Sequence, residues 1–213
     1  MVYLKRYLWY ASYGSNISKT RFECYITGGR PTGSSRVYKG CSNKTLPLSQ
    51  FVFTTPRELY FAKRSKSWSN GGVGFITSNE VPDSLTICKA YLISVDQFIE
   101  IALQESRGLT REDFDFQKCN EYGYYEMNCD SWYGMLLFLG LEEGYPIFTF
   151  TSCKALNSEI NKPNEHYLLT IITGFKELNY KNEYIVSYLE SKRGIKEYFT
   201  HSDLVSLVEK EIN

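Results

Sequence analysis

The chain has 213 residues, which are enough to bury one substantial core or two small ones. Its 24 Lys and Arg residues balance its 24 Asp and Glu residues, and no basic stripe is visible, so nucleic acid and anionic membranes are not expected partners. No apolar run approaches the roughly 18 residues of a membrane span, and the cytoplasm is the expected compartment.

The first predicted element is a strand over residues 4–11, which is aromatic and leads into Tyr13-Gly14-Ser15-Asn16. A turn of small residues leaves its backbone N–H groups accessible. Such a turn either only reverses the chain or binds a carboxylate or an oxyanion. It lacks both the G-x-S-x-G pattern of a nucleophile elbow and the Gly-Lys-Ser/Thr of a phosphate-binding loop. A long loop rich in Gly, Ser, Pro and Arg is predicted over residues 24–49.

Three β-type runs, ELYFAKR, GGVGFIT and TICKAYLI, are then separated by turn residues. The glycines after Trp68 enter a strand instead of opening a helix, which favours a tight strand start over a phosphate-binding loop. From Val95 to Leu103 the apolar residues recur at helical intervals, with Ser94 as the expected N-cap and Gly108 as the expected stop.

Residues 109–131 are predicted to form an insertion with some helix, and two strands around a Glu-Glu-Gly turn follow it. Beyond Pro163, three amphipathic stretches predict helices capped by Asn164, Asn182 and Ser202. Strands early in the chain and helices late in it favour an α+β fold over a parallel βαβ array. We expect a single domain over residues 1–213 with a helical C-terminal part over residues 164–213.

The six cysteines are scattered without a C-x-x-C pair, and the chain has only two histidines, so no metal site is expected. No cofactor motif is visible either, and no cofactor is predicted. Because a chain with this much apolar content does not need disulfides, the cysteines are expected to be free, buried thiols.

Reactive groups also occur at two later points of the chain. Glu105 ends the predicted helix that carries Glu100, and such a glutamate is either solvated or, when partly buried, able to shuttle a proton. His166 and Tyr167 follow Pro163 at a helix start, where Tyr167 is either a core aromatic with its hydroxyl bonded or part of a pocket.

Four stretches in this order, YLWYASYGSNIS, SKSWSNGGVGFI, AYLISVDQFIEIALQE and KPNEHYLLTIITGFKE, resemble the γ-glutamylcyclotransferase-like family. The features that carry the resemblance are a Tyr-Gly-Ser-Asn loop after the first strand, a tryptophan shortly before a strand that starts with Gly-Gly, a helix that ends in a glutamate, and a late tyrosine-bearing helix with a trailing glycine. Each motif is weak alone, and their common order carries the resemblance.

The resemblance implies a mixed β-barrel with flanking helices, to which residues 24–49 and 109–131 are insertions. It implies no cofactor and a small γ-glutamyl compound as the substrate. The chain departs from the family pattern at two points: Ser106 and Arg107 postpone the glycine that usually follows the catalytic glutamate, and an extra residue lies between Trp68 and Gly71. The implied catalytic residue is Glu105, and the implied substrate-binding residues are Tyr13, Gly14, Ser15, Asn16 and Tyr167.

A γ-glutamyl compound carries its own nucleophile, and the implied reaction uses it. The α-amine attacks the γ-carbonyl, closes the five-membered lactam 5-oxoproline and expels an amine, so the enzyme mainly has to orient the substrate and move protons. The sequence does not choose among an amino acid, the dipeptide end of glutathione, a polyamine or an antibiotic precursor as the leaving amine. It also leaves the oligomeric state open.

Other functions stay open at this point. A non-catalytic protein could bind a small molecule on the same scaffold. A hydrolase could use Ser15, or a cysteine, together with His166. Exposed aromatic residues could also serve an oligomer interface.

Overall fold

The structure is a computed structural model that describes residues 6–31, 36–154 and 159–210. The strands in these ranges are β1 (Tyr7–Ser12), β2 (Gln50–Thr55), β3 (Leu59–Ser65), β4 (Gly71–Ile76), β5 (Thr86–Ser94), β6 (Tyr124–Glu126), β7 (Met135–Glu142) and β8 (Tyr145–Thr151). The α-helices are α1 (Lys19–Thr27), α2 (Val95–Glu105), α3 (Phe116–Tyr122), α4 (Glu165–Glu177), α5 (Asn182–Glu190) and α6 (His201–Glu209). Short 3-10 helices are η1 (Ser15–Ile17), η2 (Lys66–Trp68) and η3 (Arg111–Asp113).

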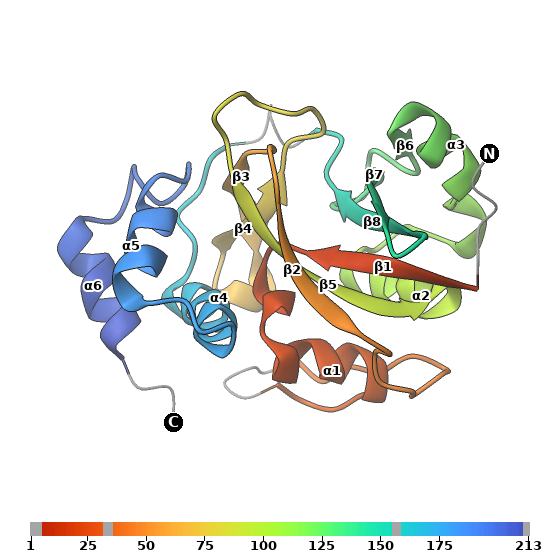
Figure 1. The fold of residues 1–213 in the computed structure, drawn as a ribbon. Helices are drawn as coiled ribbons and strands as arrows, with labels where there is room; N and C mark the ends of the chain where they lie inside the picture. The colour runs from red at the N-terminus through yellow and green to blue at the C-terminus, as the bar shows by residue number, and fades with distance from the viewer. Residues whose placement is uncertain (1–5, 32–35, 155–158, 211–213) are drawn as a thin grey trace.

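One sheet has six strands in the order β2-β5-β1-β8-β7-β6, and β3 pairs with β4 in a separate two-stranded sheet (Figure 1). Strand β1 lies inside the larger sheet, antiparallel to β5 on one side and parallel to β8 on the other. The turn after β1 therefore emerges from the middle of the sheet, where neighbouring strands hold it in place.

The larger sheet is covered on both faces because successive side chains of β1 point to opposite sides. Leu8 and Tyr10 belong to a core that includes residues of α1, α2 and α3, whereas Trp9 and Ala11 belong to a core that includes residues of α4, α5 and α6. Both sets are nearly or fully buried, so β1 has no solvent-facing side. Burying each large apolar side chain of this kind contributes about 1.5–3 kcal/mol.

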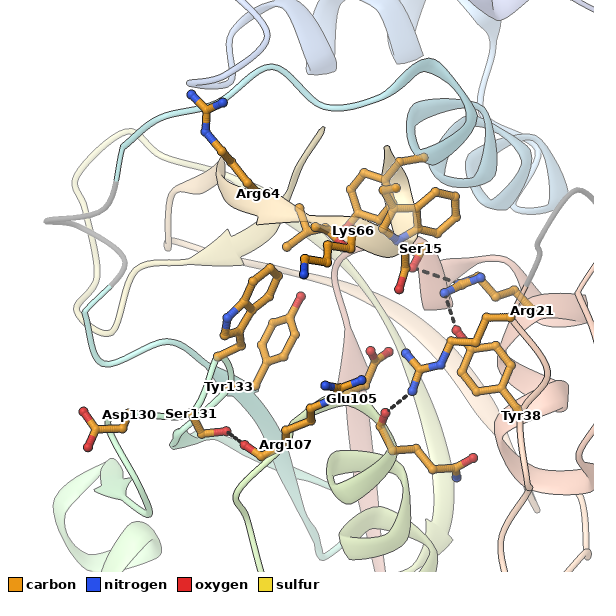
Figure 2. Close-up of a pocket in the computed structure, with 18 residues that line it drawn as sticks. Ser15, Arg21, Tyr38, Arg64, Lys66, Glu105, Arg107, Asp130, Ser131 and Tyr133 are labelled. Carbon is orange, nitrogen blue, oxygen red and sulfur yellow. Dashed lines mark hydrogen bonds between the residues drawn. The ribbon is translucent and has the colours of Figure 1, made fainter. Parts of the chain in front are cut away.

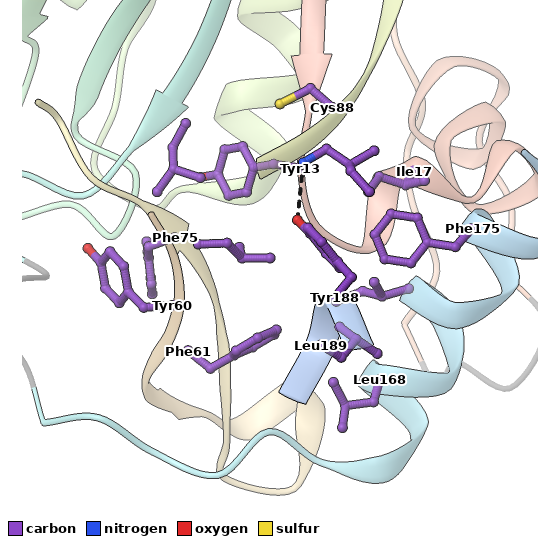
Figure 3. Packing of buried hydrophobic residues seen from close by; sticks show 14 of the residues in the cluster. Tyr13, Ile17, Tyr60, Phe61, Phe75, Cys88, Leu168, Phe175, Tyr188 and Leu189 are labelled. Carbon is purple, nitrogen blue, oxygen red and sulfur yellow. Dashed lines mark hydrogen bonds between the residues drawn. The ribbon is translucent and has the colours of Figure 1, made fainter. Parts of the chain in front are cut away.

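The C-terminal helices are packed on the strands by aromatic and branched side chains (Figure 3). Leu168 and Phe175 of α4 lie with Tyr188 of α5 on the same side of the molecule as Phe61 of β3. The backbone N–H of Ile87 in β5 donates to the hydroxyl of Tyr188 at 3.1 Å. This bond ties α5 directly to the larger sheet.

Helix α2 begins as the sequence predicts. The hydroxyl of Ser94 accepts from the backbone N–H of Gln97 and the Gln97 side chain accepts from the backbone of Ser94, which is a complete capping box. The helix ends earlier than Gly108, because Ser106 has an extended backbone and its N–H bonds back to Ala102. Glu105 is consequently the last helical residue.

The α+β class is confirmed, but the expected mixed β-barrel is not, because the sheets are not closed. Strands β4 and β8 are joined by the Thr151 side chain, whose hydroxyl accepts from the N–H of Ile76 and donates to its C=O. A side-chain hydroxyl therefore takes the place of the backbone ladder that would join the two sheets. Strands β2 and β6 remain the two edges of the larger sheet.

Several local expectations also need correction. The predicted loop over 24–49 begins with the last turn of α1, and strand β2 directly after that loop was not predicted. Helix α5 has Lys181 as its N-cap and α6 has Thr200, in place of Asn182 and Ser202. Asn164 does cap α4, and its side chain accepts from the N–H of His166 at 2.9 Å. The first two residues of the strand predicted over 4–11 lie outside the described residues.

The expectation of free cysteines is wrong for one pair, since Cys129 and Cys153 form a disulfide. Their distance in sequence hides the reason for it: β7 and β8 are antiparallel, so the segment before β7 meets the segment after β8. The other four cysteines are free, and Cys41, Cys88 and Cys119 are buried as expected. Cys24 is partly exposed.

Candidate active site

The turn over residues 13–16, called the cradle below, is buried apart from Gly14. Its last two residues are the first two of η1. The N–H of Ile17 donates to the C=O of Gly14 at 3.0 Å, which closes the turn. The hydroxyl of Tyr13 donates to the C=O of Phe150 in β8 at 2.8 Å. Tyr13 therefore anchors the cradle to the neighbouring strand.

Gly14 is needed for close approach and not for an unusual backbone conformation. Its φ of −122° is open to any residue. A Cβ at this position would lie 3.1 Å from the hydroxyl oxygen of Tyr167, which is tighter than ordinary packing. Gly74 meets the same hydroxyl, because a Cβ there would lie 3.2 Å from it.

Tyr167 of α4 is the residue held between these two glycines. It is 3% exposed, and its hydroxyl accepts from the N–H of Gly74 at 2.9 Å. Its ring packs edge-on against Trp68, with centroids 5.0 Å apart. Burial raises the pKa of Tyr167 to about 12, although the N–H groups of Gly74 and Ser15 act in the opposite direction. The phenol is therefore neutral near pH 7.

Glu105 reaches the cradle from the end of α2. Its Oε1 accepts a hydrogen bond from Nδ2 of Asn16 at 3.3 Å, and the hydroxyl of Tyr25 donates to the same oxygen. The carboxylate is half-buried and is directed into the space between Ser15 and Tyr133 (Figure 2). The structure thus brings together the mid-chain acid and the cradle that the sequence singled out.

Asn16 has an acceptor without a partner. Its Nδ2 also lies 3.3 Å from the hydroxyl of Tyr10, but its Oδ1 is buried and accepts no hydrogen bond within the described part of the chain. Burying such an atom is unfavourable unless a donor reaches it. Asn16 Oδ1 can therefore accept a hydrogen bond from one N–H or O–H group of a ligand bound beside Glu105.

Sequence reasoning missed a network that joins Ser15 to Glu105 through α1. Arg21 donates through Nε to Ser15 Oγ at 3.0 Å and through Nη2 to the Tyr38 hydroxyl at 2.7 Å. Tyr25 in turn donates to the Tyr38 oxygen at 2.9 Å, or to Glu105. The only local signal was that Arg21 and Tyr25 are one helical turn apart directly after the cradle.

Arg21 is a buried cation, 5% exposed, with no carboxylate in direct contact among the described residues. Burial acts to lower the pKa of its guanidinium, but the neighbouring hydroxyls of Tyr25 and Tyr38 and the charge of Glu105 raise it overall. The central carbon of its guanidinium also lies over the Trp68 ring, 4.9 Å from the ring centroid. Arg21 thus holds a fixed positive charge at the wall of the site.

Two adjoining spaces meet at Glu105. The inner hollow has a volume of about 30 Å³ and is lined by the cradle, Gly74 and Phe150. The outer cavity has a volume of about 730 Å³. Residues that line both are Ser15, Glu105, Tyr133 and Tyr167. A ligand in the outer cavity can therefore place one small group against Asn16 and Glu105.

The residues of the alternative hydrolase are not assembled into a catalytic pair. Ser15 Oγ accepts from Arg21, while His166 is exposed in the first turn of α4 and lines neither space. Glu100 likewise lies outside, where its Oε2 accepts from the N–H of Ser42 at 2.6 Å. Within residues 6–31, 36–154 and 159–210, no group of three or more His, Cys, Asp or Glu side chains is arranged to hold a metal ion. In the same ranges no helix is both long and apolar enough to span a bilayer.

Solved structures with this fold cover nearly the whole chain. An uncharacterized human protein matches with a TM-score of 0.50 and 16% identity over 95% of this chain and 99% of its own. A chain named γ-glutamyl cyclotransferase matches with a TM-score of 0.49 and 15% identity over 94% of this chain and 98% of its own. The second of these chains carries the name of the family that the sequence motifs resemble. At these identities the likeness concerns the fold.

A relative among curated proteins is histone deacetylase 5 of Arabidopsis thaliana, 34% identical over 187 residues. The match covers 80% of this chain but 28% of that protein, so the chain spans a little over a quarter of that relative's length. No known protein-family profile matches the chain.

Proposed function

We propose that this protein is a γ-glutamylcyclotransferase-type enzyme, which converts a γ-glutamyl amine into 5-oxoproline and the free amine. The observation that carries the proposal is the contact of Asn16 with Glu105, beside an acceptor on Asn16 that has no partner among the described residues. The ordered motifs around these residues are those that resemble the family. We further propose that residues 1–213 form one domain of this type, with 24–49 and 109–131 as insertions.

The α-ammonium group of the substrate fits the unpartnered acceptor. Asn16 Oδ1 supplies one acceptor, and the carboxylate of Glu105, bonded to Asn16 and Tyr25 through Oε1, supplies another at Oε2. A cation bound there would neutralise Glu105 and satisfy the buried amide oxygen at the same time. Each partner is fixed by a hydrogen bond before the ligand arrives, which limits the entropy that binding has to remove.

The reaction needs no nucleophile from the protein. One C–N bond forms between the α-nitrogen and the γ-carbonyl carbon, and the C–N bond to the leaving amine breaks. The α-ammonium group loses two protons on the way to the lactam N–H, and both are needed to convert the departing amide nitrogen into an ammonium group. Glu105 is assigned as the carrier of these protons in two successive transfers, and acid–base catalysis of this kind contributes about 10²–10⁴-fold.

Orientation is the larger task. Holding the amine near the carbonyl can contribute on the order of 7–11 kcal/mol. The cradle is suited to this role because it is fixed to β8 through Tyr13 and to α1 through the bond between Ser15 and Arg21. We assign the backbone N–H groups of the cradle to the carbonyl oxygen as charge develops on it. The neutral hydroxyl of Tyr167 closes the wall opposite Gly14.

Incubation with a panel of γ-glutamyl amines, followed by mass detection of 5-oxoproline, tests the proposal. The expected result is stoichiometric release of 5-oxoproline and free amine without uptake of ¹⁸O from labelled water, because no water is consumed. Free glutamate as the product would indicate hydrolysis and would contradict the proposal. Saturable binding of the same compounds without any product would favour the alternative, a non-catalytic binding protein on this scaffold.

A further inference from the structure

The outer cavity is strongly basic although the chain as a whole is neutral. Lys and Arg together equal Asp and Glu in number, 24 each, over the full sequence. Two acidic residues line the cavity, Glu105 and Asp130. The basic residues that line it are Arg21, Arg36, Arg64, Lys66 and Arg107.

Some of these charges are already matched or lie outside the space. Arg64 pairs with Glu159 at 3.1 Å, and Asp130 pairs with Lys154 at 2.6 Å. Figure 2 shows the side chains of Arg64 and Asp130 directed away from the middle of the cavity. They therefore add little to the charge that a bound molecule meets, because exposed pairs are well screened.

Lys66 and Arg107 remain. They come from separate elements, Lys66 from η2 after strand β3 and Arg107 from the turn after α2. In the described part of the chain neither has a carboxylate within ion-pair distance. Both side chains reach into the space beside Tyr133 in Figure 2. Two cations directed into one cavity repel each other, and a bound anion would relieve that repulsion.

The charges deeper in the site do not supply that anion. The carboxylate of Glu105 and the buried guanidinium of Arg21 attract each other without direct contact. Arg36 donates to the backbone C=O of Gln104. Lys66 and Arg107 are therefore the cations with which an anion bound in the outer part of the cavity would pair.

Resting on the proposed function, we propose that the half of the substrate that leaves as the amine is a dianion, bound between Lys66 and Arg107 in the outer cavity. The inner hollow of about 30 Å³ has room for little more than a water-sized group, so the leaving half must occupy the outer 730 Å³. The chemistry that fits is either two carboxylates or one phosphate monoester. A single negative charge would leave one of the two cations unmatched.

The test is an isosteric series in which only charge changes. γ-Glutamyl-glutamate has a doubly negative leaving half, γ-glutamyl-glutamine a singly negative one, and γ-glutamyl-glutaminamide a neutral one. γ-Glutamyl-phosphoethanolamine supplies the phosphate arm. With 5-oxoproline release as the readout, kcat/KM is expected to fall at least about tenfold from the best dianion to the singly charged compound, the lower limit for hydrogen bonds to charged groups. Comparison of γ-glutamyl-glutamate with γ-glutamyl-phosphoethanolamine shows whether two carboxylates or one phosphate monoester is preferred.

Variants assign the preference to residues. Lys66→Gln and Arg107→Gln should each bring the ratio between dianionic and neutral substrates toward one, mostly through KM. Arg64→Gln is the matched control, because that side chain is paired with Glu159 and directed outward, and it should keep the wild-type ratio. All three side chains are exposed, so folding is not expected to suffer.

The outcomes separate this inference from the function on which it rests. Equal kcat/KM for all compounds in the series would overturn the dianion assignment while leaving the cyclisation intact. Release of 5-oxoproline from none of them would overturn the proposed function. In that case calorimetric titration of the Glu105→Gln variant still decides the charge question: tighter binding of γ-glutamyl-glutamate than of the neutral compound supports it, and equal affinity contradicts it.

Discussion

Nδ2 of Asn16 donates to Oε1 of Glu105 at 3.3 Å, although 89 positions separate the two residues in the chain. The contact depends on two element ends that meet: α2 ends at Glu105, and η1 begins after β1. Strands β1 and β5 are neighbours in the sheet, and α2 directly follows β5. Sheet register therefore fixes the distance between the acid and the cradle.

Glu105→Gln tests the role of the acid with little change in shape. The amide cannot carry protons, so 5-oxoproline release is expected to fall at least about a hundredfold. The melting temperature should stay close to that of the unmodified protein, since the side chain is only half-buried. Glu100→Gln is the control on the same helix and should retain activity, because Glu100 lines neither space. Near-normal turnover by Glu105→Gln would remove Glu105 from the mechanism.

Tyr25→Phe tests whether the missed network positions the carboxylate. The variant loses the hydroxyl that donates to Glu105 and that bonds to Tyr38. We expect kcat to fall about tenfold with KM changed less, as for the loss of one hydrogen bond to a charged group. Tyr38→Phe, which keeps the direct bond to Glu105, should have a smaller effect on kcat. An equal loss in both variants would mean that the network serves packing alone.

Gly14→Ala separates packing from binding at the cradle. The added Cβ would lie 3.1 Å from the Tyr167 hydroxyl oxygen, so the unfolding free energy should fall by about 1–3 kcal/mol. In a Tyr167→Phe background the oxygen is absent, and the stability cost of Gly14→Ala should shrink. Affinity for a γ-glutamyl ligand should fall in both backgrounds. If the second change restored affinity, the glycine would serve only its contact with Tyr167.

Local signals predicted some local features of this fold and missed others, such as the caps of α5 and α6. The capping box at Ser94, the amphipathic α2 and the cap at Asn164 are each written within a few residues. The joining of β4 to β8 through the Thr151 hydroxyl is not, because it involves residues 75 positions apart. The sequence alone therefore could not show that the mixed β-barrel implied by the family resemblance is not closed in this chain.

The candidate site likewise contains residues that the sequence indicated and residues that it did not. The order of motifs identified Glu105 and the cradle, and the structure places them in contact. Arg21, Tyr25 and Tyr38 were missed because no pattern distinguishes a network residue from an ordinary helix or loop residue. The pair Cys129 and Cys153 was missed as well, since antiparallel pairing of β7 with β8, and not spacing, brings the two thiols together.

The disulfide gives a prediction about the cavity wall. Cys129 directly precedes Asp130, Ser131, Trp132 and Tyr133, all of which line the outer cavity. Replacing both cysteines by serine opens a loop with a sequence separation of 24 and should lower the unfolding free energy by about 3 kcal/mol.

The same double variant should raise KM more than it lowers kcat, because Glu105 and Asn16 are held by other contacts. Urea titration and steady-state kinetics check the two effects. The control is Cys24→Ser, a partly exposed free thiol, which should change neither value. If the double variant had an unchanged KM, the wall of the outer cavity would not depend on the disulfide.

Tyr167 predicts how stability depends on alkaline pH. Its pKa is about 12 in the folded protein against an ordinary value of 10.0, so the unfolded chain releases this proton first as the pH rises. The stabilisation is complete below pH 10 and is lost progressively as the pH rises toward 12, by an amount of about 2–3 kcal/mol. Urea titrations between pH 8 and pH 11.5 should show this fall, and Tyr167→Phe should make it shallower. Tyr198→Phe, an exposed position, should leave the slope unchanged. A slope in Tyr167→Phe identical to that of the unmodified protein would assign the alkaline loss to the other buried tyrosines, whose pKa values burial also raises.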